Sequence, residues 1–196
     1  MNIEEIKRHT EEKIKQLIKE FKGNPEKFLT EEDARSYLYH LLLDKFNALE
    51  NTIDKTKSIP VHCEVRWYGN SGGLKFRSDI IIFDVSTLKT KNTVSFKLPS
   101  KGYAVSKPQV AIEIKLRRKA KKSDKVFRED IEEDRKKLSQ IRNDLNTDLY
   151  SYLIAFDKKD DICFEICNTE NHKEYYVYPY ENNRVLAEQS RIIERV

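Results

Sequence analysis

The run Val110–Leu116, with the sequence Val-Ala-Ile-Glu-Ile-Lys-Leu, constrains the fold of this chain more than any other segment. It is apolar except for two opposite charges at alternate positions, Glu113 and Lys115. Side chains alternate between the two faces of a strand, so a strand would put both charges on one face and Ile112 and Ile114 on the other. We therefore predict a buried strand that carries a carboxylate and an amine side by side.

Hydrophobic periodicity and turn signals predict the other elements. Apolar residues at helical spacing predict helices over residues 3–21, from Thr30 to about 42, and over 125–145. Runs rich in β-branched and aromatic residues predict strands over 61–68, 74–85, 150–156 and 173–178. The Gly-rich segment 69–73 reads as a hairpin turn, and the polar segment 86–108 as a long excursion. This order indicates an α/β fold with a mixed central sheet flanked by helices, preceded by an N-terminal helical extension.

The length of 196 residues suits a single domain. We divide it into an N-terminal helix and linker (1–29), a core (30–157) and C-terminal strand and helix elements (158–196). The N-terminus has charges scattered among its apolar residues, which is unlike a signal peptide, and no uncharged stretch is long enough to span a membrane. Three cysteines in such a chain favour free thiols, so we expect a cytoplasmic protein with no membrane partner.

A second carboxylate, Asp79, starts the apolar run Ile80–Phe83, which we expect to be buried on both faces. A carboxylate in a dry interior is costly, and two close together raise each other's pKa. A divalent cation would offset this cost. Oxygen ligands from Asp79 and Glu113, with the carbonyl of Ile114 as a third, suit Mg²⁺, which keeps several waters.

Such a cation would lower the pKa of a bound water, position a phosphodiester and offset charge on the phosphorus oxygens. Lys115 would lie beside that water and could orient it, or help to remove its proton if burial and the metal depress the pKa of the amine. The structural alternative for Asp79, Glu113 and Lys115 is a buried ion pair plus a strand-end cap, which leaves Asp79 unexplained.

These residues resemble the PD-(D/E)XK nuclease superfamily, also called restriction-endonuclease-like. Asp79 follows a predicted hairpin turn, the triplet Glu113-Ile114-Lys115 lies in the next strand, and a helix comes after it. The resemblance covers about residues 30–157, and position 78 is Ser where the family name implies Pro. It implies a restriction-endonuclease-like core, metal ligands at Asp79 and Glu113, a catalytic Lys115, and Mg²⁺ as cofactor with Mn²⁺ as a substitute.

Many members of that superfamily also present a glutamate from the helix before the sheet. Here the candidates are Glu31 and Glu32. At 100° per residue Glu31 falls on the same face as Ala34 and Leu38, whereas Glu32 points away. We therefore predict that Glu31 joins the catalytic residues. The alternative is that all three acids at positions 31 to 33 only serve the positive end of the helix dipole.

Basic residues crowd the segment 115–125, where Asp124 is the only acid. Such a cluster suits a polyanion, because neutralised phosphates release their counterions. The alternative is a solvated loop that keeps the protein soluble. We predict that nucleic acid is bound by Arg117, Arg118, Lys119, Lys121 and Lys122.

Two further residues bear on the site. Asp134 interrupts the apolar seam of the helix predicted over 125–145. It would either support the metal site or bond to backbone at the edge of the sheet, and we favour the second. We assign His172 no nearby nucleophile or orienting acid, so Ser-His or Cys-His catalysis has no support from the sequence.

The leading hypothesis is a Mg²⁺-dependent nuclease that hydrolyses phosphodiester bonds, with DNA favoured as substrate and restriction, repair and mobile-element roles not distinguished. A homodimer that cuts both strands would follow by analogy with the fold. The first alternative is a catalytically silent nuclease-fold module that binds nucleic acid. The second is an assembly protein with no role in nucleic-acid binding.

Overall fold

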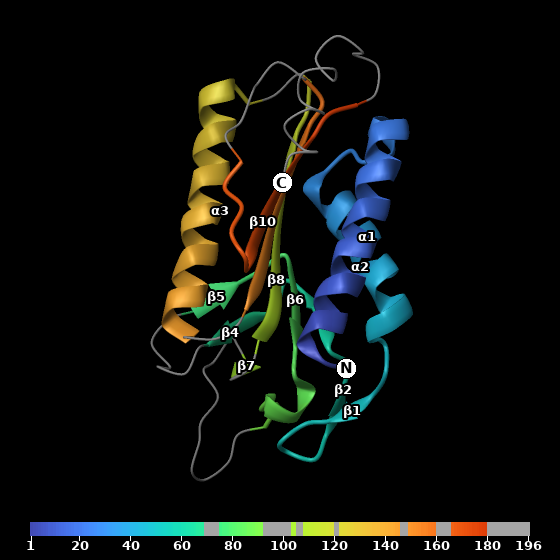
Figure 1. The fold of residues 1–196 in the computed structure, drawn as a ribbon, viewed down its shortest axis with the longest axis vertical. Helices are drawn as coiled ribbons and strands as arrows, with labels where there is room; N and C mark the ends of the chain where they lie inside the picture. Colours follow the sequence, from blue (N-terminus) through green and yellow to red (C-terminus); the bar gives the residue numbers. More distant parts are fainter. Residues whose placement is uncertain are drawn as a thin grey trace.

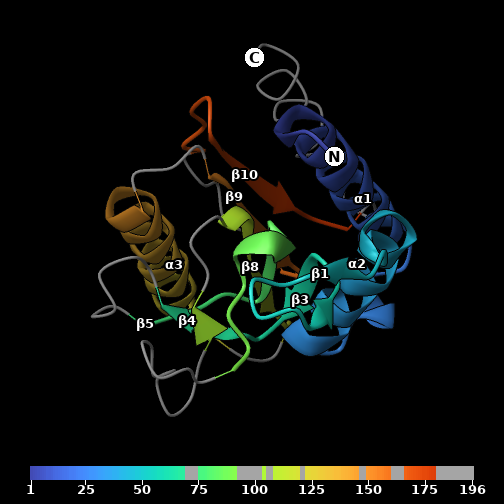
Figure 2. The same cartoon turned by 90° about the horizontal axis from the view of Figure 1, so that it is seen from below.

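A mixed β-sheet separates two helical layers (Figure 1). The computed structural model describes residues 1–68, 75–91, 103–104, 108–119, 122–145, 149–159 and 166–179. Within that part of the chain the sheet has five strands, in the order β10 (His172–Val177), β9 (Tyr150–Asp157), β8 (Pro108–Arg117), β6 (Ile80–Phe83) and β3 (Val61–Cys63). One face is covered by α1 (Ile3–Gly23) and α2 (Glu31–Phe46), and the other by α3 (Asp124–Leu145), as the view from below in Figure 2 also shows. The predicted α/β class, with a mixed sheet flanked by helices, is confirmed.

Both N-terminal helices begin at a capping box. The Asn2 side chain accepts a hydrogen bond from the third residue of α1, and the Thr30 side chain accepts one from the Asp33 N–H in α2. Each cap satisfies backbone donors that have no partner inside the helix. The predicted N-cap Thr30 is therefore confirmed. α1 buries Ile14 and Leu17 completely, so this helix contributes to the core rather than only preceding it.

The predicted strands 61–68 and 74–85 pair as a hairpin, but each is divided in two. β3 and β6 pair antiparallel in the main sheet. A separate small sheet consists of β4 (Arg66–Tyr68), β5 (Lys75–Arg77) and β7 (Tyr103–Ala104). Glu64 lies at the break and has a φ of 56°, so the chain bends out of the main sheet there. The predicted turn 69–73 lies outside the described residues.

The other half of the sheet is parallel. β8 pairs with β9 in register from Val110 opposite Tyr150, and β9 pairs with β10. α3 connects β8 to β9 across one face, the usual connection between parallel neighbours. The predicted helix 125–145 and the predicted strands 150–156 and 173–178 are confirmed to within one or two residues.

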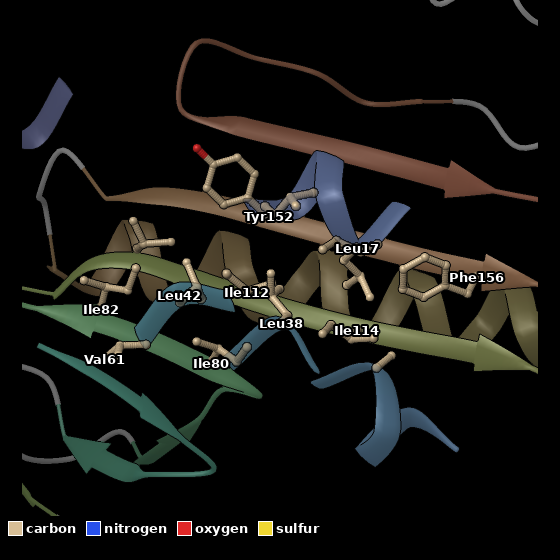
Figure 3. Packing of buried hydrophobic residues seen from close by; sticks show 14 of the residues in the cluster. Leu17, Leu38, Leu42, Val61, Ile80, Ile82, Ile112, Ile114, Tyr152 and Phe156 are labelled. Carbon is tan, nitrogen blue, oxygen red and sulfur yellow. The ribbon is translucent and has the colours of Figure 1, made fainter. Parts of the chain in front are cut away.

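Two apolar clusters fill the two faces of the sheet. Ile112, Ile114 and Leu116 of β8 pack in the cluster beneath α1 and α2, part of which Figure 3 shows. Ala111, on the opposite face of β8, packs in the cluster beneath α3. The predicted alternation along β8 is confirmed, so the charged face of this strand lies under α3.

Short elements complete the described part of the chain: η1 (Pro25–Lys27), β1 (Glu50–Asn51), β2 (Lys57–Ser58) and η2 (Val85–Thr87). Most of the predicted excursion 86–108 and residues 180–196 of the predicted C-terminal elements lie outside the described residues. The division into 1–29, 30–157 and 158–196 stays a prediction. In the described ranges, no helix combines the length and the apolar character needed to cross a membrane.

Candidate functional site

The candidate site lies where β8 extends past the start of β6. The pairing of these strands ends at Ile112, and beyond it two carboxylates bond to the edge of β8. The Ile114 N–H donates to Asp79 Oδ2 at 2.7 Å, and the Leu116 N–H donates to Glu31 Oε1 at 3.3 Å. The sheet edge thus gathers two of the predicted acids from different elements. Glu31, rather than Glu32, faces β8.

Asp79 is also held by the helix that precedes the sheet. Arg35, one turn after Glu31 in α2, places Nη1 3.2 Å from Asp79 Oδ1. The same guanidinium pairs with Glu64, which in turn pairs with Arg77. Sequence reasoning missed Arg35, although its spacing of four residues from Glu31 puts it on the same side of the helix.

Glu113 is the most buried acid of the site, with 2% of its surface exposed. Burial raises the pKa of the Glu113 carboxyl to about 8; the Lys137 ammonium opposes this shift, and the charges of Asp79 and Asp134 add to it. Lys137 Nζ lies 2.5 Å from Glu113 Oε2. Glu113 Oε1 is buried and has no hydrogen-bond partner among the described residues. The side chain therefore keeps one oxygen available to a further ligand.

Lys115 shares the face of Glu113 and pairs with α3. Its Nζ lies 3.0 Å from Asp134 Oδ2. Burial opposes the charge of this amine, but the carboxylates of Asp134, Glu31 and Asp79 together raise the pKa of Lys115 above its ordinary value. The condition under which Lys115 would remove a proton, a depressed pKa, is therefore not met in the metal-free protein. Its charged form suits a hydrogen-bond donor.

The placement of Asp134 differs from the alternative that we favoured from the sequence. Its carboxylate forms ion pairs with Lys115 and, at 3.2 Å, with Lys137, instead of serving the backbone of a sheet edge. Sequence reasoning missed Lys137 entirely. The one signal for it was its position three residues after Asp134 on α3. We refer to the acids and amines Asp79, Glu113, Lys115, Asp134 and Lys137 as the carboxylate–lysine cluster.

A divalent cation fits this cluster in a limited way. In the described residues no group of three or more His, Cys, Asp or Glu side chains is arranged to hold a metal ion. A site would therefore use two carboxylates, Asp79 and Glu113, which are close enough for the charge of one to raise the pKa of the other. The Ile114 carbonyl shares the strand edge of its own N–H and is the third predicted ligand. Mg²⁺ retains waters, so this small set of oxygens and the unpartnered Glu113 Oε1 are compatible with it.

The predicted nucleic-acid contact at Arg117 is wrong. This side chain is fully buried, and its guanidinium donates to both oxygens of Asp157 and to Asp124 Oδ1 at 2.6 Å. It also lies over the ring of Phe127. A bidentate, buried arginine stabilises the junction of β8, β9 and α3 and is not accessible to a phosphate.

The rest of the basic cluster is only partly available. Arg118 and Lys119 are exposed, and Lys121 lies outside the described residues. Lys122 places Nζ 2.6 Å from Asp130 and 3.9 Å from Glu31, so its charge is largely compensated. Arg118 and Lys122 line a pocket together with Glu31 and residues near it, which brings basic side chains next to the candidate site.

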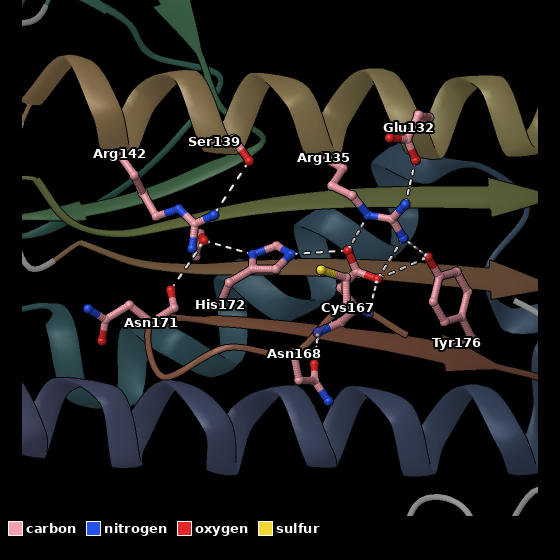
Figure 4. Close-up of polar contacts among 11 residues, drawn as sticks. Glu132, Arg135, Ser139, Arg142, Cys167, Asn168, Asn171, His172 and Tyr176 are labelled. Atoms are coloured by element: carbon pink, nitrogen blue, oxygen red, sulfur yellow. Dashed lines mark hydrogen bonds and ion pairs between the residues drawn. The ribbon is translucent and has the colours of Figure 1, made fainter. Parts of the chain in front are cut away.

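A second polar cluster lies between α3, β9 and β10 (Figure 4). His172 Nδ1 lies 2.8 Å from Ser151 Oγ, and its Nε2 lies 3.1 Å from Glu174 Oε1. Arg135 donates to both oxygens of Glu174, and the Cys167 N–H donates to one of them. The expectation that His172 lacks a nucleophile and an orienting acid is therefore wrong. The buried side chains of Ser151, His172 and Glu174 are hydrogen-bonded to one another and to Arg135, so we interpret the cluster as one that stabilises the fold.

Comparisons of this chain with models of protein families, with curated proteins and with solved structures found no match. The fold is therefore described by its own topology. Any assignment of function has to rest on the geometry of the carboxylate–lysine cluster and on the charges around it.

Proposed function

We propose that this chain is a Mg²⁺-dependent nuclease of the PD-(D/E)XK type that hydrolyses phosphodiester bonds in DNA. The observation that carries the proposal is the buried Glu113, whose Oε1 has no partner among the described residues, beside Asp79 at the open edge of β8. A buried carboxyl with a strongly raised pKa that shares its surroundings with another acid is a candidate functional group.

The order of elements supports a restriction-endonuclease-like core. Strands β3, β6 and β8 are antiparallel neighbours. Asp79 lies just before β6, and the triplet that starts at Glu113 lies in β8. α3 then leads to β9, which is parallel to β8. This is the order that the resemblance implies. A homodimer would let such a domain cut both strands of a duplex, and it belongs to the proposal by analogy with the fold alone.

Each residue has a defined part in the proposed reaction. Asp79, Glu113 and the Ile114 carbonyl would hold the cation, which supplies a bound water of lowered pKa and neutralises charge on the phosphate. Lys115, charged and held by Asp134, donates a hydrogen bond that orients the attacking water. Glu31 extends the negative potential from the edge of β8 to the pocket that Arg118 and Lys122 line.

The DNA partner is supported by the position of that pocket. Exposed Arg118 lies next to the candidate site. Its guanidinium could hold a phosphate adjacent to the one that is cleaved. The rest of the basic cluster contributes less than its sequence suggests, because Arg117 is buried and Lys122 is paired. Binding should therefore depend on salt with a modest slope.

A cleavage assay tests the proposal. Purified protein is incubated with plasmid DNA, single-stranded DNA and RNA in Mg²⁺, in Mn²⁺ and in chelator, alongside Asp79→Ala and Lys115→Ala. Exposed residues of α3 provide matched controls, Glu133→Ala and Lys136→Ala. We expect metal-dependent cleavage that both site variants lose and both controls retain. Cleavage that persists in chelator, or in Asp79→Ala, would refute the proposed mechanism.

One observation favours a second function, a catalytically silent module that binds nucleic acid. Lys137 already pairs with Glu113 and Asp134, so the cluster is compensated in part without a metal. Such a module would bind DNA in a salt-sensitive way that Asp79→Ala leaves intact, and the wild-type protein would not cleave. If the protein neither binds nor cleaves nucleic acid, the remaining hypothesis is an assembly protein.

A further inference from the structure

Lys137 approaches the proposed metal site from α3. Its side chain is 32% exposed, whereas the Glu113 side chain that it contacts is 2% exposed, so the amine reaches inward from the surface. Its Nζ lies 2.5 Å from Glu113 Oε2 and 3.2 Å from Asp134 Oδ1. The amine thus contacts both Glu113, a proposed metal ligand, and Asp134, which is not a proposed ligand.

An ammonium and a divalent cation cannot both be close neighbours of Glu113 without strong repulsion. Mg²⁺ binds carboxylate oxygens at about 2.1 Å, so a cation on the unpartnered Glu113 Oε1 would lie within a few ångströms of the ammonium on Oε2. Two positive charges a few ångströms apart in a partly buried site repel each other strongly. Lysine has a flexible stem, and Asp134 offers it a second partner close by.

We propose that Lys137 is a positioning residue that fills the Glu113 side of the metal site in the metal-free protein and withdraws onto Asp134 when a divalent cation binds. This inference rests on the proposed function and deepens it. Lys137 keeps the buried Glu113 compensated until the cation arrives, and Asp134 holds both Lys115 and Lys137 within the site. The affinity for metal is then set by a competition between the amine and the cation.

Calorimetric titration of the full chain with Mg²⁺, without nucleic acid, tests this competition. The variants are Lys137→Met, Lys137→Arg, the exposed control Lys136→Met, and Glu113→Gln. We expect Lys137→Met to bind Mg²⁺ roughly tenfold more tightly than wild type, because the positive charge that competes with the cation is gone. Lys136→Met should bind like wild type, Lys137→Arg should bind Mg²⁺ no more tightly than wild type because it keeps the positive charge, and Glu113→Gln should bind much more weakly.

A second readout separates this role from a purely structural one. In chelator, Lys137→Met should unfold at a lower temperature than wild type, because Glu113 loses its partner, and Mg²⁺ should stabilise it more than wild type. If Lys137→Met does not fold, Lys137→Gln takes its place in both measurements.

The outcomes are distinguishable. Equal or weaker Mg²⁺ binding by folded Lys137→Met, with wild-type binding that depends on Glu113, overturns the role of Lys137 and leaves the proposed nuclease intact. Absence of Mg²⁺ binding in both wild type and Lys137→Met removes the metal site, and the role of Lys137 with it.

Discussion

Two buried glutamates under α3 have pKa values that the fold shifts in opposite directions. Glu113 on β8 and Glu174 on β10 each accept a cation from the helix, Lys137 and Arg135 respectively. Both oxygens of Glu174 are hydrogen-bonded, and although burial opposes its charge, hydrogen bonds from Arg135 and His172 lower the pKa of its carboxyl to about 2. Burial raises the pKa of Glu113 to about 8.

The difference separates a structural site from a candidate functional one. A native structure rarely leaves a buried polar atom without a partner, so each exception calls for an explanation. Arginine binds Glu174 with a planar fork that fixes its orientation, whereas a lysine ammonium binds Glu113 as a single point charge on a flexible stem. The first arrangement suits a permanent contact, and the second suits a contact that a ligand can replace.

The largest expected effect comes from replacing Glu113 itself. Glu113→Gln keeps the shape of the side chain but removes a proposed metal ligand, so we expect cleavage to fall about a thousandfold, or roughly 4 kcal/mol of barrier. Glu174→Gln, assayed where it is folded, should cleave within a few-fold of wild type. Equal losses in the two variants, measured as initial rates on plasmid DNA, would remove the contrast between the clusters.

For the free energy of unfolding we expect the reverse order: replacing Glu174 should have a larger effect than replacing Glu113. Glu174→Ala leaves Arg135 and His172 without their shared partner, so we expect a loss of about 3 kcal/mol in the free energy of unfolding. Glu113→Gln should cost far less, because burial already disfavours the charged form of this carboxyl, whose pKa is raised to about 8. Urea denaturation in chelator measures both values. A larger loss for Glu113→Gln would make that residue the structural one.

The pH dependence of stability has two limbs of opposite sign. The folded pKa of Glu174, about 2, lies below the ordinary 4.5, so its contribution is present above 4.5 and is lost as the pH falls toward 2. The folded pKa of Glu113, about 8, lies above 4.5, so the metal-free protein loses stability as the pH rises from 4.5 to 8.

The variants assign each limb to its residue. Glu174→Gln should weaken the acid limb, and Glu113→Gln should flatten the upper limb, each by up to about 1.4 kcal/mol per pH unit. Urea denaturation between these pH values, in chelator, is the measurement. An upper limb that is unchanged in Glu113→Gln would assign it to another group.

The sequence predicted the elements that depend on local patterns. The alternation of Glu113 and Lys115 in an apolar run located β8, its buried face and its charged face, because strand periodicity is a local property. The helical face through Ala34 selected Glu31 over Glu32 for the same reason. The division of the predicted hairpin strands was missed, since Glu64 has a left-handed backbone conformation that its side chain does not signal.

The partners of charged residues were beyond local reasoning. Arg117 looked like part of a basic run, yet its partner Asp157 lies 40 residues away in sequence. Ser151 and His172 meet only because β9 and β10 pair in parallel. Which cation is buried and which is free is decided by tertiary pairing, and a single sequence without its fold does not contain that information in readable form.

The smallest expected effect, on DNA binding, comes from replacing one of two adjacent arginines. Arg117 is buried and paired, whereas Arg118 is exposed. Exposed Arg118 lines the pocket beside the site, so Arg118→Ala should weaken DNA binding a few-fold and reduce the salt slope by about one. Buried Arg117→Met should lower the stability of the protein instead and leave the salt slope of the folded form unchanged. Fluorescence anisotropy with labelled DNA at several salt concentrations, with Lys136→Ala as the exposed control, measures the slope. A slope that Arg118→Ala leaves at the wild-type value would move the nucleic-acid surface away from this pocket, because a cation that contacts a phosphate must release counterions when it binds.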